Sequence, residues 1–325
     1  MVLFVERVGV VGAGTMGAQL AEVLALNGKQ VVLKDVEERF VQGGMERIRS
    51  SLNQLLSFQQ TKADRELEKF EEKTGVRFSP EQREAARKTL RPNFDEKRRD
   101  AALARIKPTT RDEDLKDVDL VVEAVVEKLD VKRDLFGKLD TQVNASAVFA
   151  TNTSALPVSD IQEALSPRRR QKFLGLHFFN PIQTLPLVEV IAGRETSEET
   201  MEDCINVIAQ LRNHRYPMAP VRVKETPGFL VNRVLGAMLH EAFRCYEERI
   251  AAPRDVDIAM KAGAGFPMGP LELADMVGLD VIYHAMVNTH ERTKGQAPKP
   301  PAALEALVRA GHFGRKTGKG FFDYS

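Results

Sequence analysis

The hydrophobic positions at the start of the chain change between short apolar runs and helical periodicity. Residues 6–11 form an apolar run that ends at Gly12, and apolar side chains then recur with helical spacing up to Leu26, before Asn27-Gly28. Further apolar runs, separated by helical segments, lie at residues 31–33, 118–123 and 146–150. Strands that alternate with helices predict an α/β fold with a parallel, doubly wound sheet.

The pattern continues with strands on the far side of this sheet. Apolar runs at residues 173–177 and 185–192 are separated by the turn-rich residues 178–181, which predicts two added strands. A helix and a further strand are expected after them, at residues 198–212 and 216–223.

The character of the chain changes after Thr226-Pro227-Gly228, because from there one helical segment follows another without a strong strand. We therefore predict a Rossmann-type, doubly wound domain at residues 1–223 and an all-helical C-terminal domain at residues 224–325. The length of 325 residues agrees with two domains of roughly 150 residues each.

Residues 52–106 interrupt the alternation of strands and helices. They are highly charged but keep apolar side chains on one helix face, at Leu56, Ala63, Leu67 and Phe70. Gly75 is expected to end one helix, and residues 79–82 combine a capping box with proline at the first helical position. We interpret the segment as an extended, solvated helical insertion in the first domain.

Composition and charge narrow the classes of partner. The 47 Lys and Arg balance 46 Asp and Glu, so a net charge of +1 does not favour nucleic acid. Cys204 and Cys245 have no CxxC motif or Cys/His cluster nearby, which argues against a metal site or a disulfide framework. The chain shows neither a secretory signal pattern nor an apolar run of about 18 residues. We expect a cytoplasmic protein without a membrane partner.

The first turn carries a dinucleotide fingerprint. Gly12-Ala13-Gly14-Thr15-Met16-Gly17 matches GxGxxG, directly after a predicted strand and at the start of a helix. Gly12 permits the tight turn, Gly14 lets the backbone approach a pyrophosphate, and Gly17 lets helix and strand pack closely. Thr15 and Met16 belong to the same cofactor-binding turn. The alternative is a glycine turn in an α/β fold that binds no nucleotide.

Asp35 ends the second predicted strand, where its carboxylate can accept hydrogen bonds from the ribose hydroxyls of adenosine. The same charge repels a 2′-phosphate, so we expect NAD rather than NADP. Lys34 and Arg39 are nearby cations that could weaken this preference.

A second group of candidate residues lies in the segment GLHFFNPIQTLPLVEV. It places His177 at the end of one predicted strand and Glu189 within the next, so an antiparallel return would bring the two side chains together. The carboxylate would fix the imidazole tautomer and leave the other ring nitrogen to accept a hydroxyl proton. A histidine taken alone is more often structural than catalytic, but the motif residues around His177 favour a catalytic role.

Several motifs occur in the order in which the 3-hydroxyacyl-CoA dehydrogenases carry them. They are GAGTMG, EAVVEKLDVK, TNTSAL, GLHFFNP, ETPGFLVNR, GAGFPMGPLEL and GRKTGKGFFDY. The chain resembles this family over nearly its whole length. The resemblance implies NAD-dependent oxidation of (S)-3-hydroxyacyl-CoA in fatty acid metabolism such as β-oxidation, and a homodimer formed through the helical domain.

The resemblance also implies roles for single residues. His177 is the expected catalytic base and Glu189 its partner, with Ser154 and Asn232 as hydrogen-bonding catalytic groups near the substrate's 3-oxygen. Contacts to the nicotinamide and its ribose are expected from Glu127, Lys132, Ser154, Asn180 and Lys316.

Contacts to the acyl-CoA substrate are expected from Ser51, Ser154 and Asn232. The lysine that the family usually carries one or two turns after the Ser51 position is absent, and Phe58 stands near that place. The cations Arg47, Arg49, Lys62 and Arg65 lie on or near the same helical segment, where a solvated face is the simpler interpretation.

Other functions stay open on the sequence alone. A dehydrogenase of a sugar acid or another hydroxy acid without CoA would use the same catalytic pair, since that pair contacts only the alcohol group of the substrate. A non-catalytic structural homologue would bind NAD without turnover. Ser154 could merely cap the helix that begins near Pro157, and Asn232 could have a packing or capping role.

Overall fold

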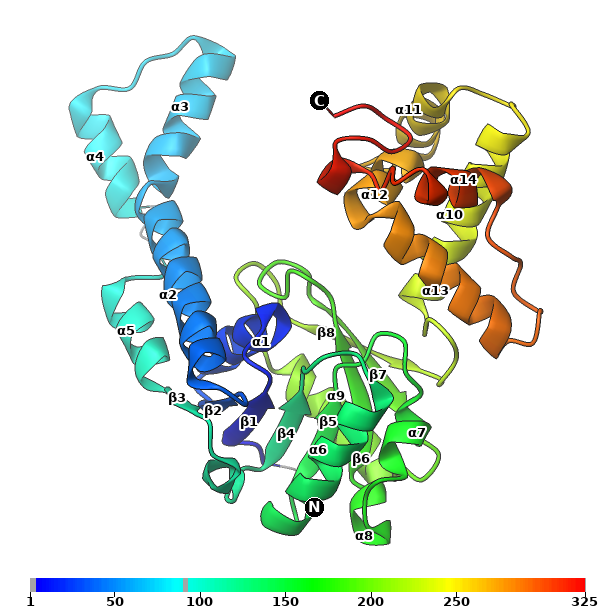
Figure 1. The fold of residues 1–325 in the computed structure, drawn as a ribbon. Coiled ribbons are helices and arrows are strands. Elements are labelled where there is room, and N and C mark those ends of the chain that lie inside the picture. The colour runs from blue at the N-terminus through cyan, green and yellow to red at the C-terminus, as the bar shows by residue number, and fades with distance from the viewer. Residues whose placement is uncertain (1–3, 90–92, 325) are drawn as a thin grey trace. The chain divides into compact units, whose positions relative to one another are not determined.

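The computed structural model describes residues 4–89 and 93–324. The chain divides into two compact units, Met1–Lys224 and Glu225–Ser325 (Figure 1). Each unit has its own hydrophobic core. Within the described ranges, no helix is both long enough and apolar enough to cross a membrane.

The first unit is built on one eight-stranded sheet, whose order is β3-β2-β1-β4-β5-β6-β7-β8. The strands are β1 (Arg7–Val11), β2 (Gln30–Lys34), β3 (Ile106–Thr109), β4 (Leu120–Glu123), β5 (Val148–Thr151), β6 (Phe173–Phe178), β7 (Leu187–Ala192) and β8 (Ala219–Val223). Strands β1 to β6 are parallel, β7 is antiparallel to β6, and β8 is parallel to β7. This confirms the predicted doubly wound sheet with strands added on one side.

The chain order of the sheet reverses at β1, which pairs with β2 on one side and with β4 on the other. Ligands of doubly wound sheets bind at such a switch point, beyond the carboxyl ends of the strands. The glycine turn follows β1, and the loop that carries Glu127 follows β4. The topology therefore brings two segments that are far apart in sequence to one end of the sheet.

Helices surround the sheet of the first unit. They are α1 (Thr15–Leu26), α2 (Glu38–Gln60), α3 (Lys62–Thr74), α4 (Pro80–Thr89), α5 (Glu96–Ala104), η1 (Asp112–Leu115), α6 (Leu129–Gln142), α7 (Val158–Gln162), α8 (Pro167–Arg170) and α9 (Glu198–Ala209). Buried aliphatic side chains of the strands, such as Val10 and Leu33, share one core with Leu20 and Val23 of α1. Burial of these apolar side chains is what holds the helices against the sheet.

The helical segment between β2 and β3 begins earlier than the sequence indicated. Helix α2 starts at Glu38 rather than near residue 52, and strand β3 starts at Ile106, where the predicted insertion ends. The sequence prediction missed β3, because its four residues include Pro108 and it lies at the sheet edge, where proline is tolerated.

Helices α3 and α4 form a hairpin (Figure 1). The end of α3 and the start of α4 were both predicted correctly. Gly75 ends α3 in the left-handed conformation, with φ of 72°. Ser79 Oγ accepts the N–H of Gln82 at 3.2 Å, and Gln82 Oε1 accepts the N–H of Ser79 at 2.9 Å, which completes the capping box. Buried Glu71 accepts Arg83 Nη2 at 2.7 Å and ties α3 to α4.

The second unit is helical, as predicted. Its helices are α10 (Val231–Glu247), α11 (Pro253–Ala264), α12 (Pro270–Val277), α13 (Leu279–Arg292), α14 (Ala302–Arg309) and η2 (Arg315–Thr317). Phe243, Leu271, Leu279 and Leu304 are fully buried at its centre.

Asp275 of α12 is buried and organises the end of the described chain. Its Oδ1 accepts the N–H of Phe321 at 3.0 Å, and its Oδ2 accepts the N–H of Phe322 at 3.0 Å and the Tyr324 hydroxyl at 3.1 Å. Gly320 passes so close that a Cβ there would lie 2.1 Å from Asp275 Oδ1. Burial, together with this carboxylate, raises the pKa of Tyr324 to about 12.

We predict that Gly17→Ala destabilises the first unit by about 3 kcal/mol, because the added Cβ would lie 1.7 Å from the Gly12 carbonyl oxygen. Gly137→Ala is the control, since its Cβ would meet only the Ala164 oxygen, at 3.6 Å. In the middle of α6 it should stabilise by about 0.5–1 kcal/mol. Urea unfolding of both variants measures the two effects, and equal unfolding midpoints would contradict the packing role of Gly17.

Candidate active site

The glycine turn after β1 has no room for side chains at two of its three glycines. Gly12 has a φ of 104°, and a Cβ there would lie 2.5 Å from the carbonyl oxygen of Ala124 in the loop after β4. Gly17 is packed against the Gly12 carbonyl. An added Cβ at Gly14 would meet no atom within 4 Å. Thus Gly12 and Gly17 form the turn and its packing, while Gly14 leaves space above the backbone.

The start of helix α1 fits a pyrophosphate. Gly14 is its N-cap and makes no side-chain capping bond, and the first turn, which contains Thr15 and Met16, has no acidic residue. The first N–H groups and the positive end of the helix dipole are therefore available to an anion.

Asp35 lies directly after β2 and is tied to the glycine turn. Its Oδ2 accepts the N–H of Ala13 at 2.6 Å, and its Oδ1 accepts the N–H of Val36 at 2.7 Å. The remaining lone pairs of both oxygens can accept the hydroxyls of a ribose. The turn and the carboxylate are thus fixed relative to each other.

The two cations near Asp35 are paired with other acids. Buried Lys34 has its Nζ 2.6 Å from Asp112 Oδ1, and the exposed Arg39 binds Glu37 with an Nε to Oε2 distance of 2.9 Å. Both cations are therefore paired with carboxylates other than Asp35. This arrangement favours the ribose of NAD over that of NADP.

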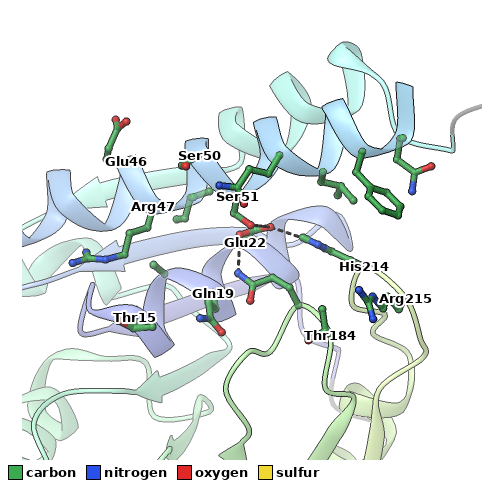
Figure 2. A pocket seen from close by; sticks show the side chains of 17 residues that line it. Thr15, Gln19, Glu22, Glu46, Arg47, Ser50, Ser51, Thr184, His214 and Arg215 are labelled. Atoms are coloured by element: carbon green, nitrogen blue, oxygen red, sulfur yellow. Dashed lines mark hydrogen bonds and ion pairs between the residues drawn. The ribbon is translucent and has the colours of Figure 1, made fainter. Parts of the chain in front are cut away.

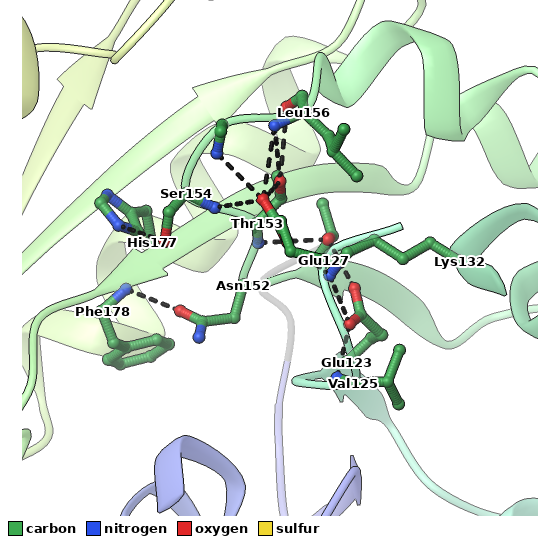
Figure 3. A network of polar contacts seen from close by, with 12 residues as sticks. Glu123, Val125, Glu127, Lys132, Asn152, Thr153, Ser154, Leu156, His177 and Phe178 are labelled. Atoms are coloured by element: carbon green, nitrogen blue, oxygen red, sulfur yellow. Dashed lines mark hydrogen bonds and ion pairs between the residues drawn. The ribbon is translucent and has the colours of Figure 1, made fainter. Parts of the chain in front are cut away.

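A buried ion pair underlies the loop after β4. Glu123, at the end of β4, and Lys132, in α6, are both about 1% exposed or less, and Lys132 Nζ lies 2.6 Å from Glu123 Oε1 (Figure 3). Glu123 also accepts the N–H of Val125 at 2.7 Å and the hydroxyl of Thr151 at 2.6 Å. The pair therefore joins β4, β5 and α6. The Lys132 ammonium is paired with two carboxylates, those of Glu123 and Glu127, and lies beneath the loop.

Glu127 connects this ion pair to the loop that carries Ser154. Lys132 Nζ lies 3.1 Å from Glu127 Oε2, and Oε1 accepts the Thr153 hydroxyl at 2.5 Å and the Ser154 and Ala155 N–H groups at 2.9 and 3.0 Å. Burial opposes ionisation of Glu127, but Lys132 and these hydrogen bonds outweigh it and lower the pKa of Glu127. Glu127 is thus an anion that shapes the loop after β5.

His177 and Glu189 face each other across the β6–β7 ladder, where they are direct register partners. The distance from His177 Nδ1 to Glu189 Oε2 is 2.7 Å, and both side chains are buried. The predicted antiparallel return therefore brings the pair together. Because a carboxylate accepts only, Nδ1 carries the proton and Nε2 of the neutral ring is the acceptor. The Ser154 hydroxyl lies 3.1 Å from Nε2 (Figure 3).

This arrangement can take a proton from an alcohol. An oxygen that replaces or joins Ser154 at Nε2 would find a base whose positive form is stabilised by Glu189. The ring of Phe179 lies beside that of His177, tilted by 55°, with centroids 4.5 Å apart.

A cavity of about 730 Å³ lies along helix α1, and Ser51 is in its wall (Figure 2). Ser51 Oγ donates to Glu22 Oε1 at 2.9 Å, and the same oxygen lies 2.7 Å from His214 Nε2. Glu22 is 1% exposed and also accepts Gln183 Nε2 at 3.2 Å. A buried carboxylate therefore holds Ser51 and the loop of His214 at the cavity floor.

The other predicted site residues lie as follows. Exposed Asn180 accepts Gln19 Nε2 at 2.9 Å, which places it beside α1 in the first unit. Asn232 is an exposed residue at the start of α10, and Lys316 Nζ lies 2.5 Å from Asp280 Oδ1; both belong to the second unit. Their place at the site stays a prediction.

Sequence reasoning missed some supporting residues. Thr153 is fully buried and binds Glu127, and Asn152 Oδ1 accepts the N–H of Phe178 at 2.9 Å. Their signal is the run of turn-forming Thr, Asn and Ser directly after a strand. The partnership of Glu22 with His214 joins residues 192 positions apart and leaves no local pattern.

The fold and these groups define a class of protein. A glycine turn with an open helix N-terminus, a carboxylate after the second strand and a His–Glu pair are the parts of a nicotinamide-dependent dehydrogenase that acts on an alcohol. Within the described ranges, no group of three or more His, Cys, Asp or Glu side chains is arranged to hold a metal ion.

The particular family is shown by comparison with known proteins. Residues 7–226 match the NAD binding domain of 3-hydroxyacyl-CoA dehydrogenase, and residues 228–324 match its C-terminal domain. The chain belongs to the 3-hydroxyacyl-CoA dehydrogenase family. The predicted family, the predicted cofactor NAD and the predicted oxidoreductase class are confirmed by these matches.

Named relatives agree over nearly the whole chain. Human hydroxyacyl-coenzyme A dehydrogenase, mitochondrial, is 38% identical and covers 99% of this chain and 92% of its own. The 3-hydroxybutyryl-CoA dehydrogenase of Clostridioides difficile is 34% identical, with 98% and 99% covered. The crystal structure of (S)-3-hydroxybutyryl-CoA dehydrogenase from Ralstonia eutropha superposes with a TM-score of 0.83 at 34% identity, covering 99% and 100% of the two chains.

We predict that Glu127→Gln lowers stability at neutral pH and that the loss depends on pH. The folded-state pKa of Glu127 lies below its ordinary value of 4.5, so its contribution is complete above that value and is lost as pH falls through the lowered pKa. The urea midpoints of wild type and variant should therefore converge in acid. Glu68→Gln, at an exposed position of α3, is the control and should change the midpoint less at neutral pH. A gap that widens in acid would contradict the assignment.

Proposed function

We propose that this protein oxidises the 3-hydroxyl of (S)-3-hydroxyacyl-CoA to the 3-oxo group with NAD, and catalyses the reverse reduction. The observation that carries the proposal is the buried His177–Glu189 pair, whose Nε2 faces the Ser154 hydroxyl. Membership of the 3-hydroxyacyl-CoA dehydrogenase family supports the substrate class.

In the proposed reaction, His177 Nε2 removes the proton of the 3-hydroxyl. Bound NAD would supply the acceptor for the hydride that leaves C3. The buried Glu189 carboxylate stabilises the imidazolium that forms, and the Ser154 hydroxyl turns from Nε2 to the substrate's 3-oxygen. Asn232 is proposed as a second donor to that oxygen. In the reduction direction, the same imidazolium returns the proton.

Cofactor contacts are proposed for residues at the switch point of the sheet. The turn of Gly12, Gly14, Thr15, Met16 and Gly17 would hold the pyrophosphate, and Asp35 the adenosine ribose. Glu127, Ser154, Asn180 and Lys316 are proposed near the nicotinamide and its ribose. Lys132 is proposed to act through Glu127, because its ammonium is buried against Glu123 and Glu127.

The substrate's CoA moiety is proposed to occupy the cavity along α1, with Ser51 as one contact and with Ser154 and Asn232 nearer the reacting end. The cavity supports this proposal because it opens beside Thr15 and Gln19 of the cofactor-binding helix and continues past Ser51. Of the cations near Ser51, Arg47 lines it, whereas Arg49 and Lys62 lie 3.9 Å from glutamates.

We predict that His177→Gln lowers kcat for acetoacetyl-CoA reduction by roughly a hundred- to ten-thousand-fold, because the general acid–base is lost. The loss of NADH absorbance measures the rate, and NADH fluorescence and circular dichroism check binding and folding. His312→Gln, a histidine outside the predicted site, should keep wild-type kcat. Near-normal turnover by a folded His177→Gln would exclude the proposed role.

The same assay separates the rival functions. Wild type should need both the CoA moiety and NADH, so free acetoacetate and NADPH should serve poorly. Equal turnover of free acetoacetate would favour a dehydrogenase of hydroxy acids without CoA. NADH binding without turnover of either compound would favour a non-catalytic homologue.

We further propose that the protein is a cytoplasmic homodimer that pairs through its helical unit. The exposed apolar residues of that unit support the dimer; they include Val234, Ile250, Ile258, Met276, Val277 and Val281. Two free cysteines support a reducing compartment, and burial raises the pKa of the Cys204 thiol to about 12, which makes it unreactive.

Light scattering should give wild type twice the chain mass of 36.3 kDa. Val234→Glu with Val281→Glu, at side chains 62% and 52% exposed, should give the chain mass, because charges replace apolar contacts. Val76→Glu, at a valine of the first unit that is 52% exposed, should remain dimeric. A monomeric wild type would exclude the dimer.

A further inference from the structure

A second cavity, of about 440 Å³, lies next to the cavity of Ser51 and is lined by cations. Four arginines contribute to it, namely Arg98, Arg105, Arg212 and Arg215. His214 is also in its wall, and among the described residues that line it there is no aspartate or glutamate. We call it the arginine cavity. The cavity of Ser51, by contrast, is lined by Glu22 and Glu46 as well as by arginines.

The four guanidinium groups of the arginine cavity have no carboxylate partner among the described residues. None of them lies within 4.0 Å of a described aspartate or glutamate oxygen in an ion pair. Arg105 Nη1 donates to the Ala25 carbonyl, at 3.4 Å, and Arg98 Nη1 donates to the Asn93 carbonyl. Some other exposed arginines of the same unit pair with acids, as Arg222 does with Glu198 and Glu202. The four guanidinium groups of this cavity differ from these in that no carboxylate among the described residues pairs with them, and they gather in one cavity.

The loop that carries two of these arginines is held by its backbone. Asn27, which ends α1, donates from Nδ2 to the Arg212 carbonyl at 2.8 Å and accepts the Arg212 N–H at 2.9 Å. The buried Asn213 accepts the N–H of Arg215 at 2.9 Å. His214 is fixed through Glu22. The loop is thus positioned without using the guanidinium groups, which stay available to a ligand.

The two cavities form neighbouring parts of one groove. Leu55, Gln59, His214 and Arg215 line both of them. Ser51, Leu55 and Gln59 are spaced by four residues, so they lie on one face of α2. This face runs about 12 Å from Ser51 to Gln59, at 1.5 Å per residue. A long ligand that contacts Ser51 can therefore reach the arginines by following α2.

The geometry points to the arginine cavity as the site for the phosphate groups of the substrate's CoA moiety, an inference that rests on the proposed function. Guanidinium groups bind phosphate oxygens through paired, charge-assisted hydrogen bonds. The lysine that the family resemblance led us to expect after Ser51 is replaced by Phe58, whose ring instead stacks with Arg65 at 4.0 Å. The arginines would supply the missing positive charge.

The test compares two thioesters that differ only in the phosphate-bearing nucleotide. Arg212→Gln with Arg215→Gln should raise KM for acetoacetyl-CoA by roughly ten-fold or more, because two charge-assisted contacts are lost. Its kcat should stay at the wild-type value. KM for acetoacetyl-pantetheine, which lacks the nucleotide, should not change. Added salt should reduce the difference between variant and wild type with acetoacetyl-CoA.

Lys138→Gln with Arg168→Gln is the matched control, since these exposed cations of α6 and α8 line neither cavity. It should leave KM for both thioesters unchanged. The inference is overturned if the arginine variant keeps the wild-type KM for acetoacetyl-CoA, or if KM rises equally for both thioesters. A third outcome would also overturn the inference. Inorganic pyrophosphate would inhibit wild type but not the arginine variant, while both would have the same KM for acetoacetyl-CoA. The cavity would then bind a separate anion.

Calorimetric binding of CoA keeps this inference distinct from the proposed function. Weaker CoA binding by the arginine variant than by wild type supports the site even if wild type reduces neither thioester, and in that case only the proposed reaction fails. Unchanged CoA binding together with normal turnover of acetoacetyl-CoA removes the arginine site and leaves the proposed function intact.

Discussion

The buried ion pair of Glu123 and Lys132 is the interaction on which the catalytic end of the sheet depends. It joins β4, β5 and α6 and continues through Glu127 into the loop of Ser154. A charge pair taken out of water is stable only when its remaining hydrogen-bonding capacity is satisfied, and here Val125 and Thr151 do so. Loss of either partner would leave a buried charge and would release the loops on both sides. One network of buried charges therefore both positions the loop of Ser154 and keeps Glu127 ionised.

Much of the fold was predictable because its signals are local. The glycine turn, the apolar strands and the helix caps at Gly75 and Ser79 are each fixed by neighbouring residues, and the structure has them where the pattern placed them. Strand β3 was missed because its stability comes from pairing with β2 at the sheet edge, while its own residues include a lysine and a proline. Propensity cannot reveal a strand that its neighbour creates.

The candidate site divides in the same way. His177 and Glu189 were predictable because an antiparallel turn joins two short strands, so sequence distance and spatial distance are both small. The burial of Lys132 was not predictable. A family resemblance indicates that a residue lies near the cofactor, but it does not say whether the side chain faces the cofactor or the protein interior. The arginine cavity could not be foreseen either, because its charges come from α5, from the residue that caps α5 and from the loop before β8. Only the folded chain brings these segments together.

The buried carboxylate of Asp275 has a consequence for the time course of biosynthesis. Its partners are the N–H groups of Phe321 and Phe322 and the hydroxyl of Tyr324, which leave the ribosome well after α12 does. If α12 were buried before they emerge, the Asp275 carboxylate would leave water without these hydrogen-bond partners, which would cost free energy. The first unit needs no residue beyond Lys224 for its own core and can complete folding on the translating ribosome. We therefore expect the two units to fold in sequence during synthesis, the nucleotide-binding unit before the helical unit.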